Sequence, residues 1–141
     1  MSLIDEHNSV IQFLNFQVKE SHIVFLESGK CAIGINFTPK GTIKTSMHQF
    51  ILGLEVHIKD TEDKFHIDLI TESIFSYKKD VDVEELKRSL FIVNAPAIVF
   101  PYIRAYISSL SALSGMPTLT LPTLNLMELG DTLKDNLTTV E

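Results

Sequence analysis

Apolar and polar residues alternate through the first three-fifths of the chain, as in strands that bury one face. The first such stretch covers about residues 12–27, and its alternation slips near residues 20–22, which predicts a bulge or twist there. A second stretch follows Gly29, and Pro39 and Gly41 are expected to interrupt its pairing and to mark a bend. Its apolar positions share one face: Cys31, Ile33, Ile35 and Phe37.

The next two alternating stretches predict a β-hairpin. The first has Leu52 to Ile58 on its apolar positions, and the second begins at Phe65 after a run of polar residues. A two-residue loop at Thr61 and Glu62 would place every apolar residue opposite an apolar partner. The expected pairs are Ile58 with Phe65, Val56 with Ile67, Leu54 with Leu69, Lys59 with Lys64, His57 with His66 and Glu55 with Asp68.

The last two-fifths of the chain has helical periodicity. Asp82 is expected to cap a helix that has Leu86, Leu90 and Val93 on its inner face and that ends at Pro96. A longer helix follows over residues 99–114, and Gly115 should end it in a left-handed conformation. A stripe of apolar residues marks its inner face, with small residues over much of the rest: Ile103, Ile107, Leu110 and Leu113.

A short extended stretch, residues 118–121, leads past Pro122 to a last helix over about residues 126–137. Four strands followed by helices predict an α+β fold. We expect a four-stranded antiparallel sheet with a long helix and a shorter C-terminal helix on one face. The length of 141 residues fits one domain, residues 1–141.

Composition and charge exclude several function classes. The net charge of −6 argues against nucleic-acid binding, which rests on Lys and Arg. The single cysteine, Cys31, allows no internal disulfide or thiolate zinc site, and its apolar neighbours favour a small buried side chain. No secretion signal and no apolar run of membrane-spanning length is apparent, so we expect a cytoplasmic protein without membrane insertion. No glycine loop that could cradle phosphate is present, and no cofactor is expected.

Two sequence blocks resemble the SecB family of bacterial protein-export chaperones. The first runs from Ala95 to Arg104, and its Phe-Pro-Tyr-x-Arg pattern is typical of that family at a helix start. The second runs from Pro117 to Leu129, and residues 74–76 add a weaker match. The residues that carry the family motif are Pro96, Phe100, Pro101, Tyr102, Arg104 and Asn125.

The resemblance implies an ATP-independent holdase that binds unfolded polypeptides, such as preproteins, in hydrophobic grooves. It also implies a homotetramer, a dimer of dimers, whose dimers join across strand edges. By position, the groove would be lined by Ile33, Ile35, Phe37, Leu119, Leu121, Leu124, Leu126 and Leu129. For Ile33 and Ile35, packing in the core is as good an interpretation as contact with a client. For Leu126 and Leu129, packing in the core is the favoured interpretation.

In the family the client is delivered to SecA, the translocase ATPase, which docks on acidic residues of the outer sheet face. Asp68 matches one such position and Glu27 lies next to another, whereas His22 and Leu26 occupy the acidic positions of the first strand. His66 stands where the family has an apolar residue. The alternative is a SecB-like chaperone dedicated to one partner, such as the antitoxin of a toxin–antitoxin system.

The expected hairpin gathers His57, His66, Glu55 and Asp68 on one face of the sheet. We interpret this face as a solvated polar surface without a metal, which could make docking pH-sensitive. A divalent-metal cluster, and with it a metal-dependent enzyme, is the competing hypothesis. No nucleophile paired with a base is apparent, so no catalytic residue is predicted.

Overall fold

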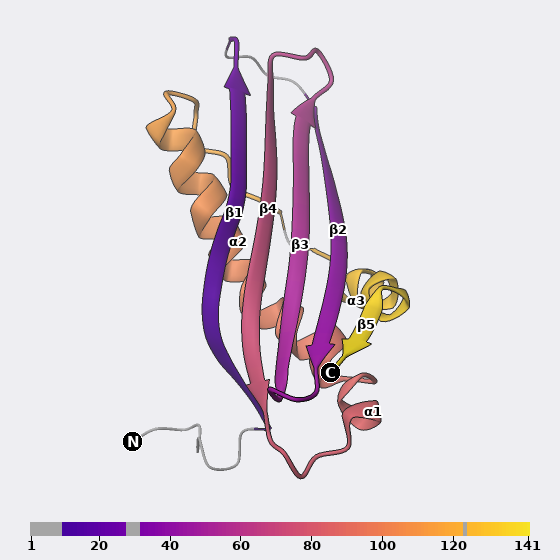
Figure 1. The fold of residues 1–141 in the computed structure, drawn as a ribbon. Helices are drawn as coiled ribbons and strands as arrows, with labels where there is room; N and C mark the ends of the chain where they lie inside the picture. Colours follow the sequence, from indigo (N-terminus) through magenta and orange to yellow (C-terminus); the bar gives the residue numbers. More distant parts are fainter. Residues whose placement is uncertain (1–9, 28–31, 123) are drawn as a thin grey trace, which may run out of the picture.

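The computed structural model describes residues 10–27, 32–122 and 124–141, so Cys31 lies outside the described residues. It has one five-stranded sheet in the order β1-β4-β3-β2-β5 (Figure 1). β1 spans Ile11–Phe25, β2 Ile33–Lys44, β3 Gln49–Asp60, β4 Phe65–Tyr77 and β5 Leu137–Val140. The register of β1 against β4 shifts at Leu14 and at Lys19. The second shift confirms the expected bulge within one residue, and the first was not predicted.

β2 pairs with β3 in one continuous register from Ile33 to Lys44, so the interruption expected at Pro39 and Gly41 was wrong. The backbone N–H of Gly41 points away from β3 and donates to the carbonyl of Asn136. Pro39 is two residues earlier, so its nitrogen faces the same outer edge, where the ladder to β3 needs no donor.

The hairpin of β3 and β4 was predicted correctly, but the register was wrong by two residues. Ile58 pairs with Ile67, and His57 pairs with Asp68 rather than with His66. The loop has four residues because one carboxylate oxygen of Asp60 accepts bonds from the backbone N–H groups of residues 64 and 65, at 2.6 and 3.1 Å. A shift of two residues keeps every side chain on its face, so the apolar pattern alone could not detect it.

The predicted four-stranded antiparallel sheet must be corrected to a mixed sheet of five strands. β5 pairs in parallel with residues 41–44 of β2, and the last helix ends at Asp135 instead of continuing to Leu137. Leu137 to Val140 is rich in β-branched residues, which favour a strand once an edge is within reach. The side-chain amide of Asn136 fixes this turn by donating to the carbonyl of Pro39.

The helical part contains α1 (Val83–Leu86), η2 (Leu90–Asn94), α2 (Ala95–Leu113) and α3 (Leu126–Asp135). Asp82 caps α1 as expected, through a bond from the N–H of Glu84. Pro96 does not end a helix but lies in the first turn of α2, where no backbone donor is required. Val93 is exposed rather than inward-facing.

The long helix confirms Ile103 and Ile107 as core residues and Gly115 as a left-handed end, with a φ of 84°. The predicted stripe was wrong at Leu113, which is 87% exposed. Ser111 takes its place on the buried face and is fully buried.

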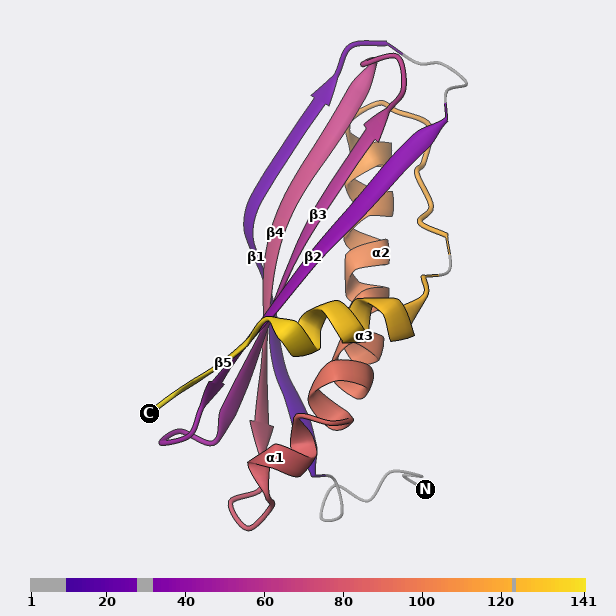
Figure 2. The same cartoon turned by 90° about the vertical axis from the view of Figure 1, so that its right-hand side faces the viewer.

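In the described part of the chain, the helices lie on one side of the sheet and none covers the opposite face (Figure 2). By length and composition alone, the 24 residues of Leu90–Leu113 could cross a membrane, with a mean hydropathy of 1.5 over a window of 18 residues, contrary to the expectation from the sequence. Its apolar face is part of the core instead: Phe91, Ala95, Val99, Ile103 and Ile107 pack with the inner face of the sheet.

We predict that Gly130→Ala destabilises the protein. A Cβ at Gly130 would lie 2.7 Å from the backbone oxygen of Ile92, so α3 would have to move away from η2. We expect a loss of about 1–3 kcal/mol in the free energy of unfolding, measured by urea denaturation. Gly34→Ala is the control, because a Cβ there meets nothing closer than 3.9 Å. Equal stability of the two variants would contradict this view of the α3 contact.

Candidate functional site

A hollow with both apolar and polar lining lies between the inner face of β2 and the beginning of α3. It has a volume of about 310 Å³, and Ile35, Phe37, Leu124 and Leu129 contribute its apolar lining. Asn125 and Glu128 form its polar rim. α3 begins here because Asn125 caps it, with the side-chain oxygen accepting bonds from two backbone N–H groups, both at 3.2 Å.

A second hollow of about 180 Å³ lies toward the other end of the same strand face. Ile33 and Phe65 line it from the sheet, and Met116 and Leu119 from the segment after α2. Because Ile33, Ile35 and Phe37 lie on one face of β2, the two hollows follow one apolar line along the strand.

The predicted groove residues differ in burial. Leu121 and Leu129 are buried in the core, although Leu129 also lines the hollow beside α3. Ile33 is 41% exposed. Leu124 is partly buried and lines the same hollow as Leu129. The other four are partly buried and pack against the core: Ile35, Phe37, Leu119 and Leu126. Their contact with a client stays a prediction.

Two serines of α2 hold the wall of the groove, and the sequence analysis missed them. The hydroxyl of Ser111 donates to the carbonyl of Ile107 at 2.9 Å and accepts from the N–H of Leu119 at 2.8 Å. The hydroxyl of Ser108 donates to the carbonyl of Leu119 at 3.1 Å. Both backbone groups of Leu119 are thus bonded to α2. The spacing of four residues from Ile103 through Ile107 to Ser111 was the signal that could have identified the buried serine.

The motif residues connect α2 to the sheet. Phe100 packs edge-on against Phe37 with 6.2 Å between ring centroids, and the guanidinium of Arg104 lies 6.0 Å from the Phe100 ring. Tyr102 instead contacts Phe13 and Phe16 of β1, at 5.1 and 5.6 Å. The motif therefore places Phe100 beside the groove and Tyr102 beside the edge strand β1.

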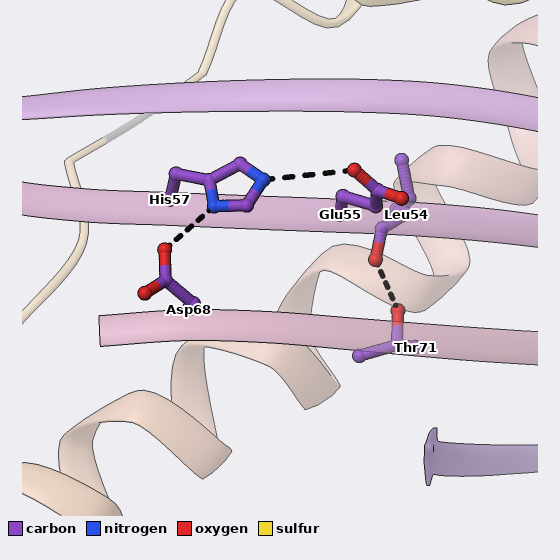
Figure 3. Close-up of polar contacts among 5 residues, drawn as sticks. All are labelled: Leu54, Glu55, His57, Asp68 and Thr71. Atoms are coloured by element: carbon purple, nitrogen blue, oxygen red, sulfur yellow. Dashed lines mark hydrogen bonds and ion pairs between the residues drawn. The ribbon is translucent and has the colours of Figure 1, made fainter. Parts of the chain in front are cut away.

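The uncovered face carries the polar cluster (Figure 3). His57 Nδ1 lies 2.7 Å from a carboxylate oxygen of Asp68, and His57 Nε2 lies 3.6 Å from one of Glu55. His66 Nε2 lies 3.7 Å from the other oxygen of Asp68. Among the described residues, no group of three histidine, cysteine or acidic side chains is arranged to hold a metal ion. Glu27, the other proposed docking residue, pairs with Lys64 at 3.3 Å.

The ion pair changes the titration of His57. The hydrogen bond that the His57 ring donates to Asp68 raises the pKa of His57 above its ordinary value, partial burial opposes this effect, and Glu55 adds to it. The cluster is therefore a histidine held between two carboxylates on an open face.

We predict that Ser111→Ala loosens the groove wall. The N–H of Leu119 would lose its acceptor inside the protein, which should cost about 1–3 kcal/mol of unfolding free energy. Hydrogen exchange at Leu119 should become faster. Ser109→Ala is the matched control, since Ser109 is exposed on the same helix and its removal should cost under about 0.5 kcal/mol. Unchanged exchange at Leu119 in the Ser111 variant would contradict the proposed contact.

We predict a pH-dependent contribution of His57 to stability. Because its pKa is raised in the folded state, the contribution is complete below the unfolded pKa of about 6.5 and is lost as the pH rises through the folded pKa. The difference in unfolding free energy between the wild type and His57→Gln should shrink from about pH 5.5 to about pH 8.5. When both proteins also carry Asp68→Asn, the difference between them should depend much less on pH. A constant difference across this range would refute the assignment.

The comparisons with known proteins agree with this architecture. A family model described as preprotein translocase subunit SecB matches residues 7–133. A protein-export protein SecB of Anaplasma phagocytophilum is 27% identical over 128 residues, which cover 79% of this chain and 80% of that protein. One of Pseudomonas fluorescens is 23% identical over 116 residues, with 82% and 72% covered.

A solved structure has the same fold. It is a SecB-like chaperone of Mycobacterium tuberculosis in complex with a ChAD peptide from the HigA1 antitoxin. It has a TM-score of 0.70 and 20% identity, and the match covers 81% of this chain and 90% of that one. With the family model matched over nearly the whole length, the resemblance found in the sequence is confirmed, and this chain belongs to the SecB family of protein-export chaperones.

Proposed function

We propose that this SecB-family chaperone is an ATP-independent holdase that binds unfolded precursor polypeptides along the groove between β2, residues 116–122 and α3. The observation that carries the proposal is the row of apolar side chains on one face of β2, Ile33, Ile35 and Phe37, which line two hollows and of which Ile33 is 41% exposed. Such a surface recognises apolar side chains and does not require chemistry or nucleotide.

The expected free energy of each apolar contact is small enough for a client to bind reversibly. Complete burial of a large apolar side chain is worth about 1.5–3 kcal/mol. The groove residues are already partly covered, so each client side chain gains less than this value. A client that spans both hollows can add several such contacts and still dissociate. Net charge of −6 on the chaperone also favours cationic segments of unfolded chains.

We propose delivery to the translocase ATPase SecA in the cytoplasm as the downstream step, with Asp68 and Glu27 as docking residues. Two observations favour a second candidate, a chaperone dedicated to one partner such as an antitoxin. Asp68 is already bound by His57, and the residue opposite it on β1 is His22 rather than an acid. The outer face is therefore less acidic at this point than a surface specialised for that docking would be.

We also propose that the chain is a single domain that assembles as a homotetramer, a dimer of dimers. β1 is the terminal strand of the sheet, so its outer edge is available for pairing with a second subunit. Ile98 and Tyr102 add exposed apolar surface on α2.

We predict that Ile33→Ser weakens client binding with little loss of stability, because Ile33 is partly exposed and faces the groove. Titration with a labelled, reduced and unfolded precursor should show affinity lower by about threefold to tenfold, as expected for losing about 1 kcal/mol or slightly more of apolar contact. Met47→Ser is the matched control, since Met47 is 57% exposed in the turn after β2, at the other end of the strand.

A peptide from the SecA C-terminus is titrated in parallel. Binding of both precursor and peptide supports export. Binding of the precursor alone supports the dedicated chaperone, and an antitoxin is then the first partner to test. If the wild-type protein binds no unfolded polypeptide, the holdase function is wrong.

A further inference from the structure

On the outer face of the sheet, His57 lies between two carboxylates that approach both of its ring nitrogens (Figure 3). Nδ1 is 2.7 Å from an oxygen of Asp68, and Nε2 is 3.6 Å from an oxygen of Glu55. A neutral imidazole has one N–H group and one lone pair, whereas an imidazolium has two N–H groups. Only the protonated ring can therefore turn a donor toward both carboxylates.

Strand pairing holds these three groups together. His57 of β3 is directly opposite Asp68 of β4 in the register, and Glu55 lies two residues before His57 on the same face of β3. Both strands have neighbours on each side, so they are central strands of the sheet. Gain or loss of a proton by His57 therefore changes the charge of the cluster while the backbone stays in place.

Further titratable groups surround the cluster. On β1, His22 is opposite Asp68 in the register, and Glu20 lies two residues earlier on the same face. On β4, His66 Nε2 lies 3.7 Å from the second carboxylate oxygen of Asp68. Three histidines thus border one carboxylate, and each of them can add positive charge to this face as the pH falls.

An outer hollow of about 470 Å³ opens beside the cluster. His57, His66 and Asp68 line it together with Lys59 of β3 and Asp63 of the following turn. On the side of β2 its lining is uncharged: Gly34, Ile35 and Asn36. Gly34 leaves this side open, since a Cβ there would meet nothing closer than 3.9 Å. A long side chain of a partner can therefore reach Asp68 through the hollow.

Protonation changes what this surface attracts. With neutral histidines, the carboxylates around the hollow outnumber its single lysine, Lys59, so the surface attracts cations. Each histidine that gains a proton offsets one carboxylate. The hydrogen bond to Asp68 raises the pKa of His57 above its ordinary value of about 6.5, against the effect of partial burial, so its titration moves toward neutral pH.

We propose that His57 is a pH-dependent internal counter-ion that occupies Asp68 and Glu55 and weakens the docking of a cationic protein segment on this face until the ring loses its proton. This inference rests on the proposed docking at Asp68 and adds its regulation. A guanidinium or ammonium group of the partner competes with the imidazolium for the same carboxylate oxygens. Proton and partner therefore oppose each other, and docking becomes tighter as the pH rises.

The test measures the affinity of the intact chaperone for a peptide of alternating arginine and glycine with blocked ends, which does not titrate between about pH 6 and pH 8.5. The affinity should rise by about fivefold to tenfold over this range at constant low ionic strength. In His57→Gln the rise should be under about threefold, with tighter binding than the wild type at the lower pH. A peptide with neutral citrulline in place of arginine should bind weakly throughout.

His48→Asn is the matched control. His48 lies in the turn before β3 with its ring against Tyr77, away from the cluster, and asparagine tolerates its φ of 52°. This variant also loses one histidine, but it should keep the full rise in affinity. Urea denaturation verifies that both histidine variants fold.

Competition between proton and partner has a second readout. Because coupling between two ligands is reciprocal, saturating arginine peptide should lower the pKa of His57, seen as a titration midpoint of the ring moved by about 0.7 to 1 in pH in NMR spectra. The citrulline peptide should leave the midpoint unchanged. A purely structural role of His57 would not produce this difference between the two peptides.

The outcomes distinguish the switch from the docking on which it rests. If the arginine peptide binds and Asp68→Asn weakens it, but its affinity is independent of pH or rises equally in His57→Gln, the switch is wrong and docking at Asp68 stands. If the arginine peptide does not bind, or if Asp68→Asn leaves its affinity unchanged, docking on this face fails together with the switch. Binding of unfolded precursor tests the holdase function independently of both.

Discussion

The stacking of Phe91 on Phe50 is the contact on which the arrangement of this molecule depends. Their rings lie 4.2 Å apart and nearly parallel, and Phe75 and Tyr77 pack around them. This cluster fixes η2, and therefore the start of α2, beneath one end of β3 and β4. From there α2 crosses the sheet diagonally toward β1, where the hydroxyl of Tyr106 donates to that of Ser21 at 2.8 Å (Figure 1).

The diagonal path of α2 explains the groove. Phe100 reaches Phe37 near the middle of β2, but the helix then moves toward β1 and leaves the far end of β2 without a helix above it. Residues 116–122 and α3 return along this end and cover it only in part (Figure 2). The two bonds from Leu119 to the serines of α2 keep this returning segment in place, so the apolar face of β2 stays partly open instead of closing into a core.

β2 has different surroundings along its length, and this gives it two roles. At its C-terminal end it is a central strand, with Ile43 fully buried and β5 beside it. At its N-terminal end it is an edge strand, with apolar side chains on one face and a hollow lined by carboxylates, histidines and a lysine on the other. An exposed edge of this kind is available for pairing with another strand.

Much of the fold could be predicted from local sequence patterns. The period-two alternation located four strands, Asp82 and Gly115 marked the helix boundaries where they were expected, and the motif around Pro101 indicated the family. Two kinds of prediction failed: those that depend on a partner far along the chain, and the register of the hairpin, which depends on one side chain in its turn. The apolar pattern of β3 and β4 fits two registers equally, and the bonds from the backbone at residues 64 and 65 to Asp60 select one of them. Pro39 looked like an interruption because the sequence does not show which side of β2 has a neighbour.

The sequence by itself determined the class of fold, the identity of the core strands and the family, because periodicity, capping and motifs are properties of neighbouring residues. Only the tertiary structure decided that Ser111 is a core residue, that Leu137 to Val140 form a strand, and that this strand pairs with residues 41–44 of β2. Each of these depends on contacts between residues distant in the sequence, and the free energy of such contacts outweighs the weak local preferences of serine, leucine and threonine.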